Sequence, residues 1–378
     1  EISACLVGSE MCIRDRVYVV RDRDLPAFSP VRSSPVTMKR LLAAVQDWAS
    51  THVVAPNWNQ TLQDLCTELA ESVFQSLIEE LHAKGVTRLI ISPTPPLDLL
   101  PLHAIPVSID NVKRPLCEVV DEVTYTPTVR MMAALFARPV QTHAAPVIVA
   151  HSGAAVPGFQ QISGPALEAA NLRAIYPDAR IIVGRDAVPS TVLTAMTGSR
   201  VVHIASHAYA AADRWASGLV LQGEQLSDAV LSAAAVLADG DLSGVQLVVL
   251  NACRTGSHRS ASRVVQTLRG LEAVFLARGA RTVVSTLWEI EDLTALVFAT
   301  VLHASVAGGD SPRRAYRTAI AYLRGRSWRG QACLEGSTCR AETLLDQAKS
   351  TWREEMDAQV GSTPLAWSAF KITGLTGA

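Results

Sequence analysis

The segments VVHIASHA (201–208), LVVLNACRTG (247–256) and ARTVVSTLWEIEDLTA (280–295) decide the fold. Each contains a short run of β-branched and other apolar residues, which is typical of a strand buried on both faces. Stretches with apolar residues at three- and four-residue spacing lie between such runs and predict helices. Strands that alternate with helices predict an α/β fold of three layers with a mainly parallel central sheet. Further runs of the strand type occupy 88–92, 146–150 and 180–184.

The first residues, EISACLVGSEMCIRDR (1–16), stand apart from this pattern. They lack the basic start and the small-residue cleavage site of a signal peptide. They resemble a translated sequencing adapter, so we set 1–16 aside as an adapter-derived artefact; the alternative is a genuine disordered tail. Under either interpretation the natural protein is expected to begin further upstream. The rest is divided into an N-terminal helical and α/β half (17–140) and a second half (141–378).

Composition excludes several classes of protein. Of the 378 residues 49% are hydrophobic and 18% are charged, which predicts a globular chain with a large core. The formal net charge of −1 and the lack of long single-sign runs argue against nucleic acid as a partner. Each apolar stretch is shorter than the roughly 20 residues of a membrane-spanning helix. We therefore expect a cytoplasmic protein that contacts neither nucleic acid nor membrane.

The cysteines do not form a disulfide framework, because five of them, an odd number, are spread widely outside the first 16 residues. Cys333 and Cys339 are interpreted as free thiols, since no CxxC motif or nearby histidine completes a zinc set. The glycine fingerprints of dinucleotide and phosphate sites are also absent. The sequence therefore predicts no cofactor.

Reactive side chains follow three of the predicted strands. His207 comes after VVHIAS, Cys253 after LVVLNA, and the acidic residues Glu289, Glu291 and Asp292 after TVVSTLW. Ligands and substrates of open α/β sheets bind at the carboxyl ends of the strands. A histidine near a thiol favours the thiolate, so His207 and Cys253 fit a base and a nucleophile.

Each of these two residues also has a simpler interpretation. Cys253 could be a small apolar filler at a strand end, and His207 a histidine that merely ends a strand. A zinc site on His203 and His207 is disfavoured, because four residues of strand span about 13 Å. We therefore predict no metal and interpret His203 as a buried structural histidine.

Together with RLIISPTPPLDLLPLHAIP (88–106) and PLAWSAFKITG (364–374), these segments resemble the CHAT domain, a family of caspase-like cysteine peptidases related to separases and metacaspases. The resemblance runs from about residue 17 to residue 374. It implies a caspase-type α/β sandwich whose catalytic half is 141–378. It also implies an endopeptidase that cleaves a protein substrate through an acyl-enzyme, with His207 as general base and Cys253 as nucleophile.

One position departs from the family pattern. The family has Gly after the catalytic histidine, and the backbone N–H groups of that residue and of the cysteine are expected to form the oxyanion hole. Here these residues are Ala208 and Cys253. Alanine keeps the donor but disfavours a positive φ angle. A catalytically weak or inactive CHAT-like scaffold that binds a protein partner is therefore the alternative function.

By resemblance to separases, Asp292 corresponds to a carboxylate that receives a basic substrate residue, which implies cleavage after Arg or Lys. The alternative is that Asp292 caps the helix that follows it. Asn251 corresponds to a residue of the same pocket, and Trp288 is either an apolar pocket wall or a buried core aromatic. Family members often follow regulatory or repeat modules, so a module of this kind is expected upstream. A basic run after Cys253 is interpreted as a solvated loop, or as a rim for acidic substrate flanks.

Overall fold

A computed structural model gives the arrangement of most of the chain, which falls into two compact units. The first unit ends at Phe136 and the second begins at Ala137, whereas the boundary predicted from the sequence follows residue 140. We describe each unit by itself. The described residues are 3–7, 16–21, 31–32, 35–51, 57–93, 95–138, 144–154, 156–213, 215–252, 270–324, 343–345 and 364–375.

The sheet of the first unit has the strand order β7-β4-β1-β2-β3, with β4 parallel to both β1 and β7. The predicted strand at 88–92 is β4 and is confirmed. Strand β1 comes from the segment that we set aside, and the adapter origin of that segment stays a prediction. The strands are β1 (Ser3–Val7), β2 (Arg16–Arg21), β3 (Val31–Arg32), β4 (Arg88–Ser92) and β7 (Glu122–Tyr125), and a separate hairpin joins β5 (Pro106–Ile109) to β6 (Val112–Pro115).

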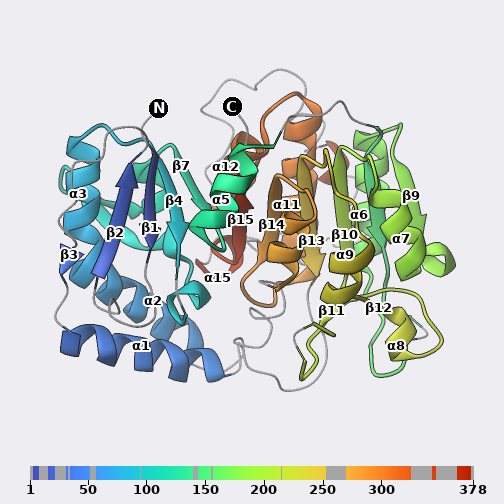
Figure 1. Cartoon of the computed structure of the whole chain (residues 1–378), viewed down its shortest axis with the longest axis horizontal. Coiled ribbons are helices and arrows are strands. Elements are labelled where there is room, and N and C mark those ends of the chain that lie inside the picture. The colour runs from blue at the N-terminus through green and yellow to red at the C-terminus, as the bar shows by residue number, and fades with distance from the viewer. Residues whose placement is uncertain are drawn as a thin grey trace. The chain divides into compact units, whose positions relative to one another are not determined.

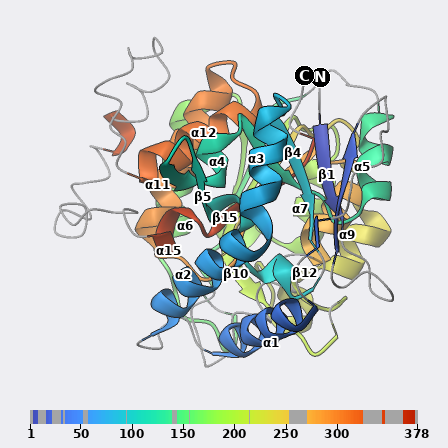
Figure 2. The same cartoon turned by 90° about the vertical axis from the view of Figure 1, so that its left-hand side faces the viewer.

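The three longest helices described in this unit have apolar residues at three- and four-residue spacing, which is typical of amphipathic helices. Figure 2 shows α2 and α3 as one continuous path, which a π-helical turn at Ala70–Phe74 connects. Their apolar face is buried and includes Leu69 and Ile78, so packing rather than capping holds these helices in place. The helices are α1 (Pro35–Ser50), α2 (Trp58–Leu69), α3 (Gln75–Ala83), α4 (Leu116–Val119) and α5 (Val129–Phe136).

The second unit contains a sheet with the order β9-β8-β10-β13-β14-β15 (Figure 1). All neighbours are parallel except β15, which runs antiparallel to β14. Every strand predicted for this half is confirmed, and most of their residues are buried, as expected for a sheet covered on both faces. The strands are β8 (Val147–Ala150), β9 (Arg180–Val183), β10 (Val201–Tyr209), β13 (Leu247–Ala252), β14 (Thr282–Thr286) and β15 (Phe370–Gly374).

Helices lie on both faces of this sheet, so the predicted α/β fold is confirmed. The connections β8–α6–β9 and β9–α7–β10 run in opposite directions across the sheet, and right-handed crossovers therefore place α6 and α7 on opposite faces. Helix α6 packs on α11 and on β8 and β10. From β8 the chain continues to β9 on one side, and from β10 it continues to β13 on the other, so the strand order reverses between β8 and β10. The helices are α6 (Gly164–Ile175), α7 (Pro189–Met196), α8 (Leu226–Ala229), α9 (Ala233–Asp239), residues 270–277, α11 (Asp292–Ala307), α12 (Pro312–Leu323) and α15 (Pro364–Trp367).

Strand β10 is longer than predicted and changes its partner along its length. Residues 202–205 pair with β8 in parallel, and residues 207–209 pair antiparallel with β11 (Gly218–Val220), which in turn pairs with β12 (Val230–Ser232). The prediction that the strand ends at Ser206 is therefore wrong. Residues 207–209 do not form an apolar run, yet they pair with β11, and Ala208 is buried there.

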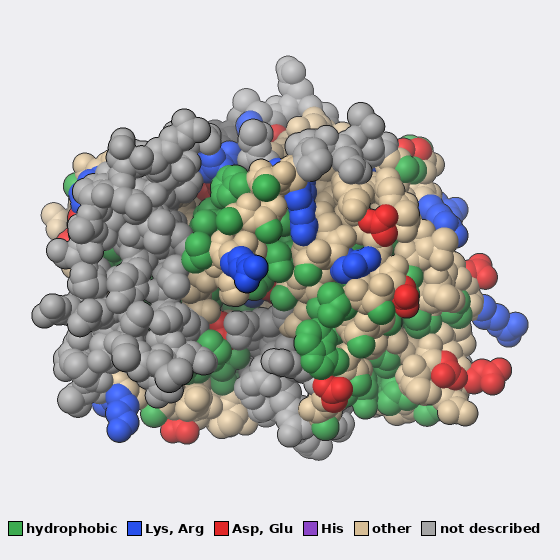
Figure 3. Space-filling model, viewed as in Figure 1, with side chains coloured by type: hydrophobic (Ala, Val, Ile, Leu, Met, Phe, Trp, Pro, Cys, Tyr) green, Lys and Arg blue, Asp and Glu red, His purple; other side chains and the backbone are tan. Residues whose placement is uncertain are grey.

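Helix α11 is buried on all sides, because every residue from Leu293 to Ser305 is buried. A helix that is apolar all round belongs in the interior of a protein. By contrast, α12 buries a single stripe that includes Tyr316, Ile320 and Leu323. Among the described helices, none combines the length and the apolar character needed to cross a bilayer. On the face shown in Figure 3, Lys and Arg side chains are interspersed with Asp and Glu.

Candidate active site

The candidate site lies at the carboxyl ends of β8, β10 and β13. Register pairs Ala150 with Ala205 and Ser206 with Ala252, so β8, β13 and the parallel part of β10 end close together. The strand order reverses between β8 and β10. In open α/β sheets such a reversal opens a crevice outside the strand ends, where ligands bind.

His207 is completely buried at this edge of the sheet. Its Nε2 lies 2.8 Å from the backbone carbonyl oxygen of Gln160. Because a carbonyl oxygen only accepts, Nε2 carries the proton and donates, and Nδ1 of the neutral ring carries the lone pair. The ring of Phe159 packs against the imidazole with 5.3 Å between centroids. The loop between β8 and α6 thus fixes both the orientation and the tautomer of His207.

Gly153 in the same loop allows this close packing. A Cβ on Gly153 would lie 2.6 Å from Cδ2 of His207 and 2.9 Å from the Gln160 carbonyl oxygen. Its φ of 79° also lies in the region that favours glycine. The position therefore needs glycine for two separate reasons.

His151 is a second histidine beside the candidate base, and it was not among the residues predicted for the site. Its Nδ1 accepts the Gly153 N–H at 3.2 Å, and its Nε2 faces Gln222 Oε1 at 3.4 Å. Burial, more than the neighbouring His207, lowers the pKa of His151. A neutral His151 therefore braces the backbone of the loop that holds His207.

The predicted nucleophile, Cys253, lies outside the described residues, as does the basic run after it. The structure describes β13 as far as Ala252, whose pairing partner on β10 is Ser206. His207 and Cys253 each follow one member of this pair in the sequence. The dyad itself stays a prediction.

Ala208 lies in the antiparallel part of β10, opposite Leu219, and is buried. Among the described residues other than glycine, positive φ angles occur only at Asp110 and Asn111. Ala208 is therefore extended, and the concern that this position requires a positive φ angle is not supported. Its role in an oxyanion hole stays a prediction.

Asp292 makes a contact that neither interpretation anticipated. It is the first residue of α11, and the N-cap residue, Glu291, makes no side-chain cap. Instead, Oδ2 of Asp292 accepts the backbone N–H of Gly164, the first residue of α6, at 3.0 Å. Asp292 thus lies inside α11 and contacts α6, so the alternative that it caps its own helix is not supported. A carboxylate at a helix N-terminus is favoured by the free N–H groups and the dipole of that helix.

The other two residues predicted to line the pocket are buried. The amide nitrogen of Asn251 donates to Glu168 Oε2 at 2.8 Å and to the Ala295 carbonyl oxygen at 3.2 Å. Trp288 is 1% exposed, which fits the alternative of a core aromatic. Their role in a substrate pocket stays a prediction.

Comparison with known families agrees with this architecture. The model of the CHAT domain matches residues 63–375. The chain belongs to the CHAT domain family. No curated protein matches this CHAT domain significantly.

Solved structures with a similar chain path are distant in sequence. The Arg-specific cysteine proteinase gingipain R is 8% identical with a TM-score of 0.43, over 89% of this chain and 75% of its own. The Saccharomyces cerevisiae separase in complex with securin is 11% identical with a TM-score of 0.46, over 94% of this chain. The CHAT domain spans only 21% of that separase-complex chain.

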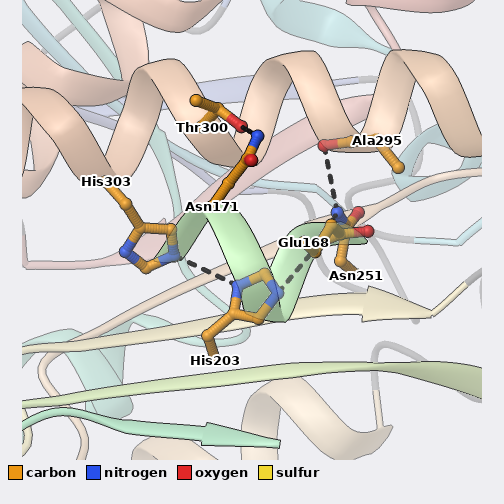
Figure 4. Close-up of polar contacts among 7 residues, drawn as sticks. All are labelled: Glu168, Asn171, His203, Asn251, Ala295, Thr300 and His303. Carbon is orange, nitrogen blue, oxygen red and sulfur yellow. Dashed lines mark hydrogen bonds and ion pairs between the residues drawn. The ribbon is translucent and has the colours of Figure 1, made fainter. Parts of the chain in front are cut away.

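Behind the strand ends, the CHAT domain contains a buried polar network (Figure 4). Glu168 Oε2 lies 2.9 Å from His203 Nε2, and His203 Nδ1 lies 3.1 Å from His303 Nε2. Burial raises the pKa of Glu168 to about 8 and lowers the pKa of His203 to about 3. His203 is confirmed as a buried histidine. Within the described residues, no group of His, Cys, Asp and Glu suits a metal ion.

Proposed function

We propose that this CHAT domain is a cysteine endopeptidase that cleaves a protein substrate, with His207 as general base and Cys253 as nucleophile. The observation that carries the proposal is the hydrogen bond from His207 Nε2 to the Gln160 carbonyl. It leaves Nδ1 as the basic nitrogen of a ring that is held at the carboxyl end of the sheet. The adjacent strand β13 leads directly into Cys253.

The chemistry follows from these roles. The Cys253 thiol gives its proton to Nδ1 of His207, and the sulfur attacks the carbonyl carbon of the scissile peptide. The imidazolium then protonates the leaving amine as the C–N bond breaks. Water then attacks the thioester carbonyl carbon and gives one proton to His207. The C–S bond breaks, and His207 returns that proton to the sulfur, which restores the thiol. The Gln160 carbonyl stabilises the imidazolium, because a hydrogen bond from a charged donor is stronger than one from a neutral donor.

The backbone N–H groups of Ala208 and Cys253 are the proposed donors to the oxyanion of the tetrahedral intermediate. We further propose that Asp292 favours a basic residue before the cut. Asp292 is partly exposed, and only its Oδ2 has a hydrogen-bond partner within the described part of the chain. The second oxygen of the carboxylate would then receive the cation of Arg or Lys.

Two measurements test the proposal. A peptide chloromethyl ketone labels the reactive thiol, and a peptide library reports cleavage. Cys253→Ala and His207→Ala should each abolish both signals. Cys66→Ala is the matched control, because burial raises the pKa of this thiol to about 12 and keeps it unreactive. Full activity in either site variant would overturn the proposal. An inert but folded wild type would favour the scaffold function.

A further inference from the structure

The carboxyl of Glu168 joins two neighbouring strands of the sheet at a single atom. Glu168 lies on α6 and is 3% exposed. Its Oε2 contacts His203 Nε2 on β10 at 2.9 Å and Asn251 Nδ2 on β13 at 2.8 Å. Figure 4 shows His203 and Asn251 on the two sides of Glu168. One helix side chain therefore sets the distance between these two strand residues.

The two strand residues are close in sequence to the proposed dyad. His203 precedes His207 by four residues, and Asn251 precedes Cys253 by two. Side chains alternate along a strand, so His203 and His207 belong to the same face of β10. Asn251 is the register partner of Ala205, which lies midway between the two histidines. A displacement of His203 or Asn251 is therefore transmitted to the nearby dyad residue through only a few residues of backbone.

The far side of the network rests on α11 and on Tyr176, the residue that follows α6. His203 Nδ1 lies 3.1 Å from His303 Nε2, and Tyr176 Oη donates to the His303 carbonyl oxygen at 3.1 Å. The Asn251 amide also donates to the Ala295 carbonyl oxygen. The buried helix α11 therefore provides a rigid support, and Glu168 connects that support to the strand ends.

We propose that Glu168 is a positioning residue of the peptidase site, which fixes the ends of β10 and β13 relative to each other so that His207 and Cys253 are held in register. This inference rests on the proposed function. Among the described residues, the side chain of Glu168 bonds to His203 and Asn251, so it acts through these two.

The proposal predicts how two substitutions differ. Alanine at position 168 removes both contacts. Glutamine keeps an oxygen that accepts from Asn251 and from a His203 ring protonated at Nε2. Glu168→Ala should therefore lower kcat by about 100-fold, the typical effect of a small misplacement of reacting groups, with little change in KM. Glu168→Gln should restore most of the lost kcat at pH 6.5.

Asn171→Ala is the matched control. Asn171 lies on the same helix and is buried, and its amide donates to Thr300 Oγ1 on α11 at 3.0 Å. In the described structure its side-chain hydrogen bond thus goes to α11 and not to β10 or β13. This variant should lose stability as Glu168→Ala does, yet keep the kcat of the wild type. An equal loss of kcat in both alanine variants would show that Glu168 acts only through stability and would overturn the proposal.

Hydrogen exchange of backbone amides provides a readout that does not depend on activity. Glu168→Ala should speed exchange at residues 203–208 and 249–252, whereas Asn171→Ala should not. If the wild type cleaves and labels normally but exchange at these strand ends is unchanged in Glu168→Ala, the positioning role is refuted and the peptidase function stands. If the wild type is inert, the peptidase function fails, and the exchange rates still decide whether Glu168 fixes the strand ends.

Discussion

The buried carboxyl of Glu168 should make the protein less stable as the pH rises, and Glu168→Gln should remove this effect. Burial is the main cause that raises the pKa of Glu168 from 4.5 to about 8, the charge of Asp292 also raises it, and the hydrogen bond from Asn251 lowers it. Between these two pKa values the folded protein keeps a proton that the unfolded chain has lost. The stability that this proton contributes is complete below pH 4.5 and is lost as the pH rises towards 8.

The size of the effect follows from one proton. A difference of one bound proton changes the free energy of unfolding by about 1.4 kcal/mol per pH unit, so about 2 kcal/mol is lost between pH 6.5 and 8. Burial lowers the pKa of His203 from 6.5 to about 3. At pH 6.5 this histidine is still half protonated in the unfolded chain, and it becomes neutral there as the pH rises, which adds a smaller slope of opposite sign. Glu168→Gln keeps His203, so the difference between this variant and the wild type reports on Glu168.

The assay is unfolding in urea at four pH values from 6.5 to 8.0 for the wild type, Glu168→Gln and Asn171→Ala. The wild type and Asn171→Ala should lose about 2 kcal/mol more than Glu168→Gln over this range. Asn171→Ala loses the hydrogen bond to Thr300, so it should be less stable than the wild type at every pH. It keeps the Glu168 carboxyl, so its stability should fall with pH as steeply as that of the wild type. Equal slopes in the wild type and Glu168→Gln would refute the reasoning, because the carboxyl would then be ionised already at pH 6.5.

Three other substitutions test the site. Gly153→Ala should lower activity by about 100-fold, because the added Cβ would lie 2.6 Å from His207 Cδ2. Gly158→Ala is the control: its φ is 84°, but no atom lies within 4 Å of the added Cβ, so it should lower stability through backbone strain without that loss of activity. Asp292→Asn keeps an acceptor for the Gly164 N–H but removes the charge, so cleavage after Arg and Lys should fall by about 30-fold or more. If the cleavage preference on a peptide library is unaltered, Asp292 does not line the substrate pocket. Ala208→Gly should leave kcat unchanged and lower stability by about 0.5–1 kcal/mol, as glycine does within a strand; a large loss of kcat would show that the alanine side chain has a role in catalysis.

Most of the regular structure could be predicted because each element has its own local pattern. The apolar runs that form β4, β8 and β13 and the periodic stretch that forms α6 need no distant partner to be seen in the sequence. The antiparallel extension of β10 could not be predicted in this way. Its residues, His207 to Tyr209, pair with β11 and not with β8, and that pairing continues the strand beyond the apolar run.

The network around Glu168 depends on contacts between residues far apart in the chain. Glu168 and Asn251 are separated by 83 positions, and His203 and His303 by 100. The one local signal was an acidic residue within the apolar helix PALEAANLRAIY. That signal gives no partner, because an acidic residue on a helix is most often exposed to solvent. The contact of Asp292 with Gly164 was hidden for the same reason.

The two helices after β14 should differ sharply in the substitutions that they accept. From Leu293 to Ser305, α11 has no position that faces solvent, so a charged side chain at any of them would be buried without a ready partner. In α12 each turn has one or two buried residues, and the positions between them are exposed or partly exposed. In a deep mutational scan, charged substitutions should therefore be harmful at every position from Leu293 to Ser305 of α11. In α12 they should be harmful mainly at the buried positions, which recur with the period of the helix.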